Sequence, residues 1–344
     1  MKAVRIHAPG GIDALRHEDC EEPQLKRPTD VRVKLLAAAV NRVDLELRSA
    51  ADGGFVLPHI LGCDGAGRIE AIGREVIHIK SGDAVCIYPF VHCGRCESCT
   101  LKEHELCTDR RILSQRENGT YAEYITVPAK NCFPIPAGFS SEEAASFPLV
   151  YSTAWRLLMT QGKLIPGELV LIRGVGGGIA TASLQIAASV GARLIVSSAQ
   201  DEKLATAKAL GFELTINDQK TDLPKEVRRL TGKHGVDLVL DCTGGPDWAK
   251  SLACIARGGR LVTCGAIASA NPPTDLRRVF WNHLKICGAT RPTREEFRQV
   301  LKFFEHSRVK PIIDRVYSLR EAAEAQRRME ERLQFGKIVL RTDS

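Results

Sequence analysis

Four cysteines lie close together in the segment VHCGRCESCTLKEHELC, residues 91–107: Cys93, Cys96, Cys99 and Cys107. Thiolates at such short spacing can bind a metal, carry redox chemistry or pair as disulfides. The whole chain has 12 cysteines in 344 residues and 44% hydrophobic residues, a density far below that of small domains that disulfides hold together. We therefore expect metal binding or catalysis from this cluster rather than cross-links.

The spacing C-x2-C-x2-C-x7-C narrows the kind of metal site. It resembles the start of a ferredoxin run, but that run continues with C-x3-C-P, whereas here the fourth cysteine is Cys107 and Thr108 follows it. Zinc ribbons that bind nucleic acids use two separated knuckles, while these cysteines share one lobe with Glu97, Glu103 and Glu105. Four thiolates make a closed tetrahedral shell, so the sequence predicts one structural Zn²⁺.

Composition and charge exclude other classes of protein. The formal net charge is +7, but Lys and Arg are scattered, without a long basic run or interleaved aromatic residues, so we expect no nucleic-acid partner. No apolar run reaches about 18 residues, so we expect no membrane span and a soluble, cytoplasmic protein. A mildly basic chain is compatible with an anionic cofactor.

A glycine-rich turn, GVGGGIA at residues 174–180, provides the second kind of chemistry. A buried strand, LVLIR (169–173), precedes it and an amphipathic helix at 179–192 follows it. Residues without Cβ let the backbone approach a pyrophosphate, and the amides at the helix start face the anion. We assign the dinucleotide phosphates to Gly174, Gly176, Gly177, Gly178 and Ile179.

The end of the second strand of this unit, RLIVSS (193–198), bears on the choice of cofactor. An enzyme selective for NAD usually has Asp or Glu here, which accepts a hydrogen bond from the ribose 2′-hydroxyl and would repel a 2′-phosphate. This chain has Ser197 and Ser198, followed by Lys203. Two hydroxyl donors and an ammonium favour NADP(H) over NAD(H), unless Lys203 is only a solvated helix residue.

The pattern along the chain predicts an α/β protein with two domains. Before residue 166 there are short β-branched runs broken by Gly and Pro (31–40, 67–73, 83–90 and 120–128), which indicate a mostly-β unit. After it, strands alternate with helices, as in a doubly wound parallel sheet. Strands are expected at 169–173, 193–198, 213–217, 236–243, 260–267 and 284–290, and helices at 179–192, 201–211, 225–232 and 247–259. We also assign Thr243 and Ala266, near two strand ends, to the cofactor.

Several motifs in the expected order resemble the zinc-containing medium-chain dehydrogenase/reductase (alcohol dehydrogenase) superfamily. They are the cysteine lobe, PHILGCDGAGRIEAIG (58–73), GTYAEY (119–124), STAW (152–155) and GKIVL (336–340). The resemblance implies a GroES-like catalytic domain at 1–148, completed by 291–344, and a Rossmann dinucleotide-binding domain at 149–290. It also implies homodimers or homotetramers that pair Rossmann sheets edge to edge, with Arg42 at the pyrophosphate and Thr153 at the nicotinamide.

The sequence departs from this family where zinc alcohol dehydrogenases bind their catalytic zinc. The three ligand positions hold Asn41, Cys63 and Leu149, Asp64 replaces a glutamate, and Val43 stands where a hydroxyl residue relays the alcohol proton. Since a catalytic zinc needs about three protein ligands, we expect it to be missing. Asn41, Cys63 and Asp64 remain as candidate catalytic residues.

Around Asn41 the segment AAAVNRVDLELR instead resembles the quinone-oxidoreductase-like branch, which uses no zinc but usually lacks the cysteine lobe. The sequence therefore predicts an NADP(H)-dependent oxidoreductase that interconverts alcohols and aldehydes or ketones. One alternative is an NADPH-dependent quinone or enone reductase. A second is a nucleotide-binding protein that has lost catalysis.

Overall fold

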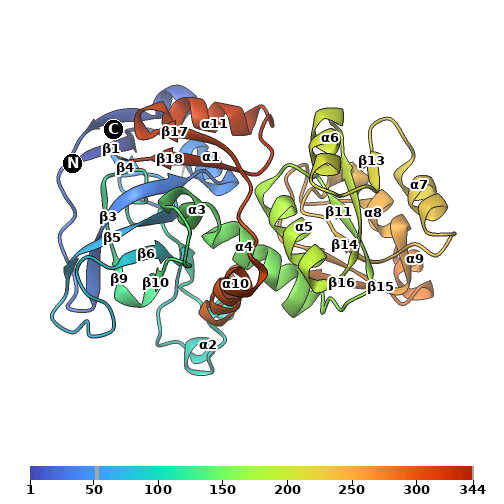
Figure 1. The fold of residues 1–344 in the computed structure, drawn as a ribbon, viewed down its shortest axis with the longest axis horizontal. Helices are drawn as coiled ribbons and strands as arrows, with labels where there is room; N and C mark the ends of the chain where they lie inside the picture. The colour runs from blue at the N-terminus through green and yellow to red at the C-terminus, as the bar shows by residue number, and fades with distance from the viewer. Residues whose placement is uncertain (51–53, 343–344) are drawn as a thin grey trace. The chain divides into compact units, whose positions relative to one another are not determined.

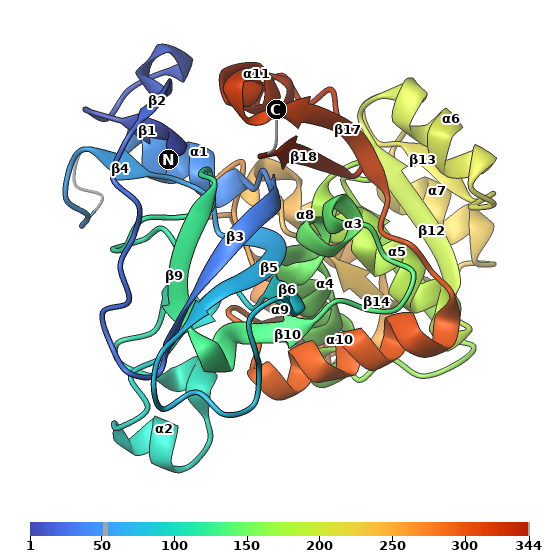
Figure 2. The same ribbon diagram turned by 60° about the vertical axis from the view of Figure 1, so that its left-hand side comes forward.

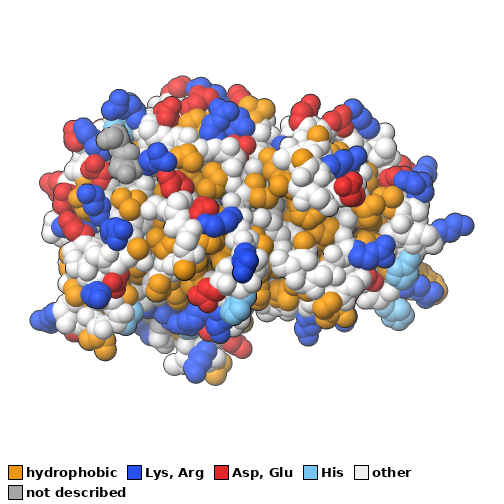
Figure 3. All heavy atoms as spheres, viewed as in Figure 1, with side chains coloured by type: hydrophobic (Ala, Val, Ile, Leu, Met, Phe, Trp, Pro, Cys, Tyr) orange, Lys and Arg blue, Asp and Glu red, His pale blue; other side chains and the backbone are white. Residues whose placement is uncertain are grey.

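The computed structural model describes residues 1–50 and 54–342. The chain forms two compact units, Met1–Val150 with Thr293–Ser344, and Tyr151–Pro292. The predicted domain boundaries, after residues 148 and 290, lie within two residues of these limits. None of the helices in the described part of the chain is both long and apolar enough to cross a membrane. On the face drawn in Figure 3, Lys and Arg side chains lie interspersed with Asp and Glu.

The first unit is built on a seven-stranded sheet whose centre is β3 (Asp30–Ala39). Val31, Val33 and Leu35 on β3 are buried in the core, as expected for alternating β-branched and apolar residues on a strand. β3 pairs antiparallel with β5, β9 and β18. The other strands of the sheet are β5 (Asp64–Ile72), β6 (Ala84–Ile87), β9 (Tyr124–Pro128), β10 (Cys132–Pro134), β17 (Ile313–Ser318) and β18 (Lys337–Arg341).

The C-terminal segment completes this first sheet. β18 lies between β3 and β17, with Val339 opposite Ala39, so the terminal GKIVL motif pairs with a strand about 300 residues earlier in the chain. α10 (Arg294–Ser307) contributes Phe297 and Phe304, both buried, and α11 (Ala322–Glu330) precedes β18. Figure 2 shows β17 and β18 beside α11.

Smaller elements complete the first unit. A three-stranded sheet contains β2 (Arg16–Asp19), β1 (Lys2–Ile6) and β4 (His59–Ile60), and β7 (Phe90–Val91) pairs with β8 (Arg111–Ile112) at the base of the cysteine lobe. The lobe itself contains the short helix α2 (Glu97–Thr100), which Figure 2 shows at the end of a loop excursion from the sheet. α1 (Arg42–Ser49), α3 (Ser141–Ser146) and the start of α4 (Pro148–Trp155) follow strands or loops of the same unit.

The second unit is a six-stranded parallel sheet in the order β13-β12-β11-β14-β15-β16. This order reverses direction between β11 and β14, as in a doubly wound dinucleotide-binding fold. α5 (Gly178–Val190) and α6 (Asp201–Ala209) lie on one face of the sheet, and α7 (Leu223–Leu230), α8 (Trp248–Cys254) and α9 (Leu276–Trp281) lie on the other (Figure 1). The strands are β11 (Leu169–Arg173), β12 (Arg193–Ser198), β13 (Thr215–Asn217), β14 (Val236–Leu240), β15 (Ile255–Thr263) and β16 (Lys285–Gly288).

Two of the predicted strands, 169–173 and 193–198, coincide with β11 and β12. The predicted helix at 247–259 is wrong in its second half, because α8 ends at Cys254 and β15 begins at Ile255. Ile255 pairs with Val236 on β14, and a Cβ on Gly259 would lie 2.6 Å from the Ile255 side chain. Neighbouring strands, not local periodicity, decide where the helix stops.

Gly62, which precedes Cys63, permits a close approach in the first unit. Its φ is +99°, and a Cβ there would lie 2.3 Å from the Tyr121 ring and 2.5 Å from Thr120 Oγ1. Gly82 has a similar φ of +92°, but a Cβ there would meet nothing within 4 Å. The two glycines therefore share the backbone conformation and differ in the surrounding space.

We expect Gly62→Ala to lower the free energy of unfolding by more than Gly82→Ala. Both variants carry the cost of a left-handed non-glycine residue, and Gly62→Ala adds overpacking against Tyr121, worth about 1–3 kcal/mol. Urea denaturation of both variants and the wild type measures the difference. Equal losses of unfolding free energy in the two variants would show that the Tyr121 ring moves aside at no energetic cost.

Candidate functional site

A buried polar cluster connects three distant segments of the first unit. Asn41 precedes α1, Asp64 begins β5 and Lys337 begins β18. The Lys337 ammonium donates to Asn41 Oδ1 at 2.6 Å, to the Val40 carbonyl at 2.9 Å and to Asp64 Oδ2 at 3.3 Å. Asn41 Nδ2 donates to the same Asp64 oxygen at 2.8 Å. All three side chains are almost completely buried.

The remaining oxygen of Asp64 and the neighbouring thiol complete the cluster. Asp64 Oδ1 accepts from the backbone N–H of Leu149 at 2.9 Å, and Cys63 Sγ lies 3.5 Å from Asn41 Nδ2. Burial raises the pKa of the Cys63 thiol well above its ordinary value, so this side chain is neutral. Burial also raises the pKa of Asp64, against the opposing effects of Lys337 and Asn41.

Asp44 positions Asn41 from the first turn of α1. Asp44 Oδ2 accepts from the Asn41 backbone N–H at 2.8 Å and from the Tyr121 hydroxyl at 2.9 Å, and Asn41 and Asp44 together form a capping box. Burial raises the pKa of Asp44 to about 7. Within residues 1–50 and 54–342, Asp44 Oδ1 has no hydrogen-bond partner. The side chain orders the turn before α1.

The donor set at these positions does not fit a catalytic zinc. Leu149 has no ligand atom, the Asn41 carbonyl oxygen accepts from Lys337, and both oxygens of Asp64 are engaged. Of the predicted positions, Cys63 alone keeps a good zinc-ligand atom, whereas a catalytic zinc needs about three protein ligands. Lys337 was not predicted from the sequence, because GKIVL marks a strand but carries no sign of which distant residues its lysine meets.

The cysteine lobe, by contrast, fits a structural zinc. The four Sγ atoms of Cys93, Cys96, Cys99 and Cys107 all lie within 4.8 Å of one another. Sγ of Cys93 is 3.9 Å from that of Cys99 and 3.6 Å from that of Cys107, close to the ~3.8 Å edge of a tetrahedron with Zn–S bonds of ~2.3 Å. Within the described residues, these four cysteines are the His, Cys, Asp or Glu side chains that lie close enough together to hold a metal ion.

Backbone amides of the lobe favour the thiolate form of Cys93 and Cys96, whereas burial raises the pKa of Cys99 to about 12. The N–H groups of Arg95 and Cys96 lie 3.5 and 3.4 Å from Cys93 Sγ, and they lower the pKa of Cys93. Backbone N–H groups of Thr108 and Cys99 lower the pKa of Cys96 to about 6. Hydrogen bonds to ligand sulfurs of this kind orient a metal's ligands and favour their charged form.

In the second unit, the glycine-rich turn connects β11 to α5. Gly174 and Gly176 have φ of +71° and +103°, a conformation that residues with a Cβ rarely adopt. Gly177 is the N-cap of α5 and makes no side-chain cap hydrogen bond. The N-terminal amides of this 13-residue helix, from Gly178 and Ile179 onwards, can therefore bind an anion.

Ser197 and Ser198, the two serines expected at the ribose of the cofactor, have different surroundings in the structure. The Ser197 hydroxyl is fully buried and donates to Asp218 Oδ2 at 3.0 Å, and this carboxylate lies 3.2 Å from Arg173 Nη2. Ser197 therefore holds β12 and the segment after β13 together, and its hydroxyl is already engaged. Ser198 accepts from the Gln200 N–H at 3.2 Å. Asp218 was not predicted from the sequence. Its position directly after β13, next to β12 in the sheet, is the signal that could have identified it.

Thr243 and Ala266 lie on two segments that touch, after β14 and around the end of β15. The Ala268 N–H donates to the Thr243 carbonyl at 2.8 Å, and a Cβ built on Gly244 would lie 3.6 Å from the Ala266 side chain. Thr153 is a buried residue of α4 in the same unit. Arg42 belongs to the first unit, next to Asn41, where it begins α1 and lies 3.8 Å from Glu46.

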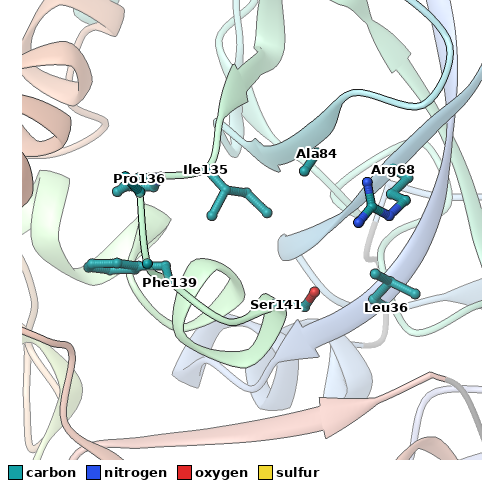
Figure 4. Close-up of a pocket in the computed structure, with 10 residues that line it drawn as sticks. Leu36, Arg68, Ala84, Ile135, Pro136, Phe139 and Ser141 are labelled. Carbon is teal, nitrogen blue, oxygen red and sulfur yellow. The ribbon is translucent and has the colours of Figure 1, made fainter.

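The first unit also contains a pocket of about 270 Å³, drawn in Figure 4. Its lining includes the apolar side chains of Leu36, Ile135 and Phe139, with Arg68 at one side. The Arg68 guanidinium donates to the Gly82 carbonyl at 3.1 Å. None of the predicted site residues lines this pocket, so it is separate from the Asn41–Asp64–Lys337 cluster.

Two protein-family models match the chain. "Alcohol dehydrogenase GroES-like domain" matches residues 27–137, and "Zinc-binding dehydrogenase" matches residues 178–306. An NAD-dependent alcohol dehydrogenase of Sulfurisphaera tokodaii is 31% identical, over 99% of each chain. An acryloyl-coenzyme A reductase of the same organism is 26% identical, over 99% of this chain and 100% of its own. A solved structure of an NAD-dependent alcohol dehydrogenase aligns over 100% of both chains, with 40% identity and a TM-score of 0.94.

We expect Cys107→Ser to lower both zinc content and thermal stability, because loss of one thiolate opens the closed shell. For each 2 kcal/mol by which the free energy of unfolding falls, the melting temperature should fall by about 4–8 °C. Elemental analysis and thermal melting measure the two effects. Cys20→Ser is the control, because Cys20 is a half-buried cysteine outside the lobe. A Cys107→Ser protein that kept its zinc and its melting temperature would contradict the assignment.

Proposed function

We propose that this chain, which belongs to the zinc-containing medium-chain dehydrogenase/reductase family, interconverts alcohols with aldehydes or ketones using NADP(H) and no catalytic zinc. The chain is an oxidoreductase with a GroES-like and a Rossmann-type domain. The observation that carries the zinc-free mechanism is the Lys337 ammonium bound to Asn41 and Asp64.

In this proposal the bound nicotinamide supplies or accepts the hydride, and the protein binds and orients it. The amides at the start of α5 bind the pyrophosphate, and Thr153, Thr243 and Ala266 contact the nicotinamide half of the cofactor. Asn41, Cys63 and Asp64 shape the reacting site, while Lys337 neutralises Asp64 and fixes the amide of Asn41. A carbonyl oxygen would then be polarised by hydrogen bonds rather than by a metal.

A second candidate activity is NADPH-dependent reduction of an enone or quinone. Hydride transfer to a conjugated carbon needs cofactor orientation and hydrogen bonds to the carbonyl, but no Lewis acid. The oxygens of Asp64 are engaged by Leu149 and Lys337 and so do not offer a metal site, which this chemistry does not need, and the relative named acryloyl-coenzyme A reductase supports it. The third possibility is a non-catalytic nucleotide-binding protein. Membership of a family of dehydrogenases argues against it.

We also propose a homodimer or homotetramer in the cytoplasm. β16 is an edge strand of the six-stranded sheet, and Ile286 on it is 42% exposed. An exposed edge with an apolar side chain can pair with the same edge of a second copy. None of the 12 cysteines, all within the described residues, forms a disulfide, which suits a reducing compartment.

The purified protein tests the proposed reaction. We expect NADPH oxidation with aldehydes or ketones and about one zinc per chain, because the lobe offers four ligands and the buried cluster does not. Cys63→Ala should have the same zinc content as the wild type. The products separate the two activities, since carbonyl reduction yields an alcohol and enone reduction yields a saturated carbonyl. Sedimentation of the same preparation measures the oligomer.

Two outcomes would contradict this proposal. Two zincs per chain, with one lost in Cys63→Ala, would establish a catalytic zinc. Tight NADPH binding without turnover of any aldehyde, ketone, quinone or enone would favour the non-catalytic reading.

Cofactor preference is tested at Ser198 and Lys203. Ser198→Asp should raise the KM for NADPH far more than that for NADH, because it adds a negative charge near the 2′-phosphate. Lys203→Ala should raise the KM for NADPH roughly 10- to 100-fold if a charged hydrogen bond worth about 1.5–3 kcal/mol is lost, and less if solvent screens it. Lys208→Ala, on the same helix, is the control.

Relatives named NAD-dependent alcohol dehydrogenases set the opposite expectation. A wild-type protein that already prefers NADH, or variants with an unchanged NADPH to NADH ratio, would show that residues 198 and 203 do not recognise a 2′-phosphate.

A further inference from the structure

Two cysteines that the proposed reaction does not use lie side by side in the second unit. Cys242 follows β14, and Cys264 follows β15. On these parallel strands Leu240 is the register partner of Val262, so the two cysteines stand at equivalent positions two residues beyond this pair. Their Sγ atoms are 3.2 Å apart, and both residues are half-buried.

This geometry is close to that of a disulfide. Neighbouring strands lie about 4.7–4.9 Å apart, within the ~4.4–6.8 Å that separates the Cα atoms of bonded cysteines. The sulfurs must approach by only about 1.2 Å from their 3.2 Å separation to reach an S–S bond of about 2.04 Å. Hydrogen bonds from Ile267 N–H to the Cys242 carbonyl and from Ala268 N–H to the Thr243 carbonyl already hold the two segments together.

The two thiols differ in their chemistry. The contact between the two sulfurs, in which either can be the donor, lowers the pKa of Cys242 and raises that of Cys264. The pair therefore combines a sulfur that can attack peroxide as a thiolate with an adjacent thiol that can resolve the product. Cys254, on α8 of the same unit, is fully buried, and its burial raises the thiol pKa to about 12.

We propose that Cys242 and Cys264 form a redox-active dithiol that hydrogen peroxide converts to a disulfide, and that this modification weakens binding of NAD(P)(H). The Cys242 thiolate attacks one peroxide oxygen, the O–O bond breaks, and the departing hydroxide takes a proton, which leaves a sulfenic acid. The Cys264 sulfur then attacks Cys242, the S–S bond forms, and the S–O bond breaks as water leaves with the thiol proton. Two thiols are oxidised, and one peroxide is reduced to two waters.

The effect on the cofactor rests on the proposed function. Thr243 is adjacent to Cys242, and Ala266 lies two residues after Cys264; both are assigned to the nicotinamide half of the cofactor. A disulfide here would fix the two segments to each other through a covalent bond and so restrict the adjustment of Thr243 and Ala266 to a bound nucleotide. The disulfide itself depends only on the geometry of β14 and β15.

Peptide mapping tests the disulfide directly. Trypsin places Cys242 in the peptide 234–250 and Cys264 in the peptide 261–277, and each peptide contains no other cysteine. The full-length protein is treated with equimolar hydrogen peroxide, blocked with N-ethylmaleimide and digested. We expect the two peptides to be recovered as a linked pair in the wild type and in Cys287→Ser. Cys287 is a half-buried cysteine on the neighbouring strand β16 and serves as the control.

Fluorescence titration of NADPH and NADH before and after peroxide tests the coupling. We expect the dissociation constant to rise by on the order of tenfold and to recover with dithiothreitol in the wild type and in Cys287→Ser, but to stay constant in Cys242→Ser and Cys264→Ser. Zinc content, measured in parallel, reports whether the lobe is intact.

Absence of the linked pair would overturn the proposal. An equal loss of affinity in Cys242→Ser would trace the effect to other thiols and overturn the coupling, as would a disulfide that leaves the affinity unchanged. A reduced protein that binds neither nucleotide would contradict the proposed function instead, while the peptide map would still decide whether the dithiol exists.

Discussion

The buried ammonium of Lys337 is the interaction on which the first unit depends. A charge removed from water is costly unless hydrogen bonds and an opposite charge compensate it. Here three acceptors, on Val40, Asn41 and Asp64, surround the ammonium. Removal of any one partner would leave a buried polar group unsatisfied, so this cluster holds the start of β18 against the end of β3 and the start of β5. The last strand of the chain is thereby locked to the first half.

In the proposed function, the same cluster accounts for a buried site that differs from the cysteine lobe in what it offers a metal. In the lobe, four cysteine sulfurs converge and backbone N–H groups favour the charged form of Cys93 and Cys96, so that a divalent cation is the natural partner. Around Asp64, an ammonium already supplies positive charge, and both carboxylate oxygens are engaged. The Lys337 ammonium supplies there the positive charge that a metal would otherwise supply, but it provides no open coordination position.

The second unit concentrates its chemistry at the carboxyl ends of its parallel strands. There, Arg173, the last residue of β11, meets Asp218 and Asp241 at 3.2 Å each, which balances two buried carboxylates. The glycine-rich turn, Ser197 and the Cys242–Cys264 pair lie at the ends of neighbouring strands. Parallel strands bring such residues together because their carboxyl ends meet at one edge of the sheet.

The sequence by itself determined features that depend on short spacing. The four lobe cysteines converge because they lie within one short segment, and β11 and β12 could be located because a buried apolar run between turn residues is a local signal. The resemblance to zinc alcohol dehydrogenases placed Asn41 and Leu149 at ligand positions, and residue type alone excludes an aliphatic side chain as a ligand.

Only the tertiary structure decided which distant groups meet. Lys337 bonds to Asp64 across 273 positions of sequence, Ser197 directs its hydroxyl to Asp218, and Cys242 meets Cys264 because two strands share a register. α8 ends at Cys254 rather than at residue 259 because Ile255 is drawn into pairing with β14. Strand register and burial are set by packing of the whole domain, and a one-residue shift would turn each of these side chains to another face.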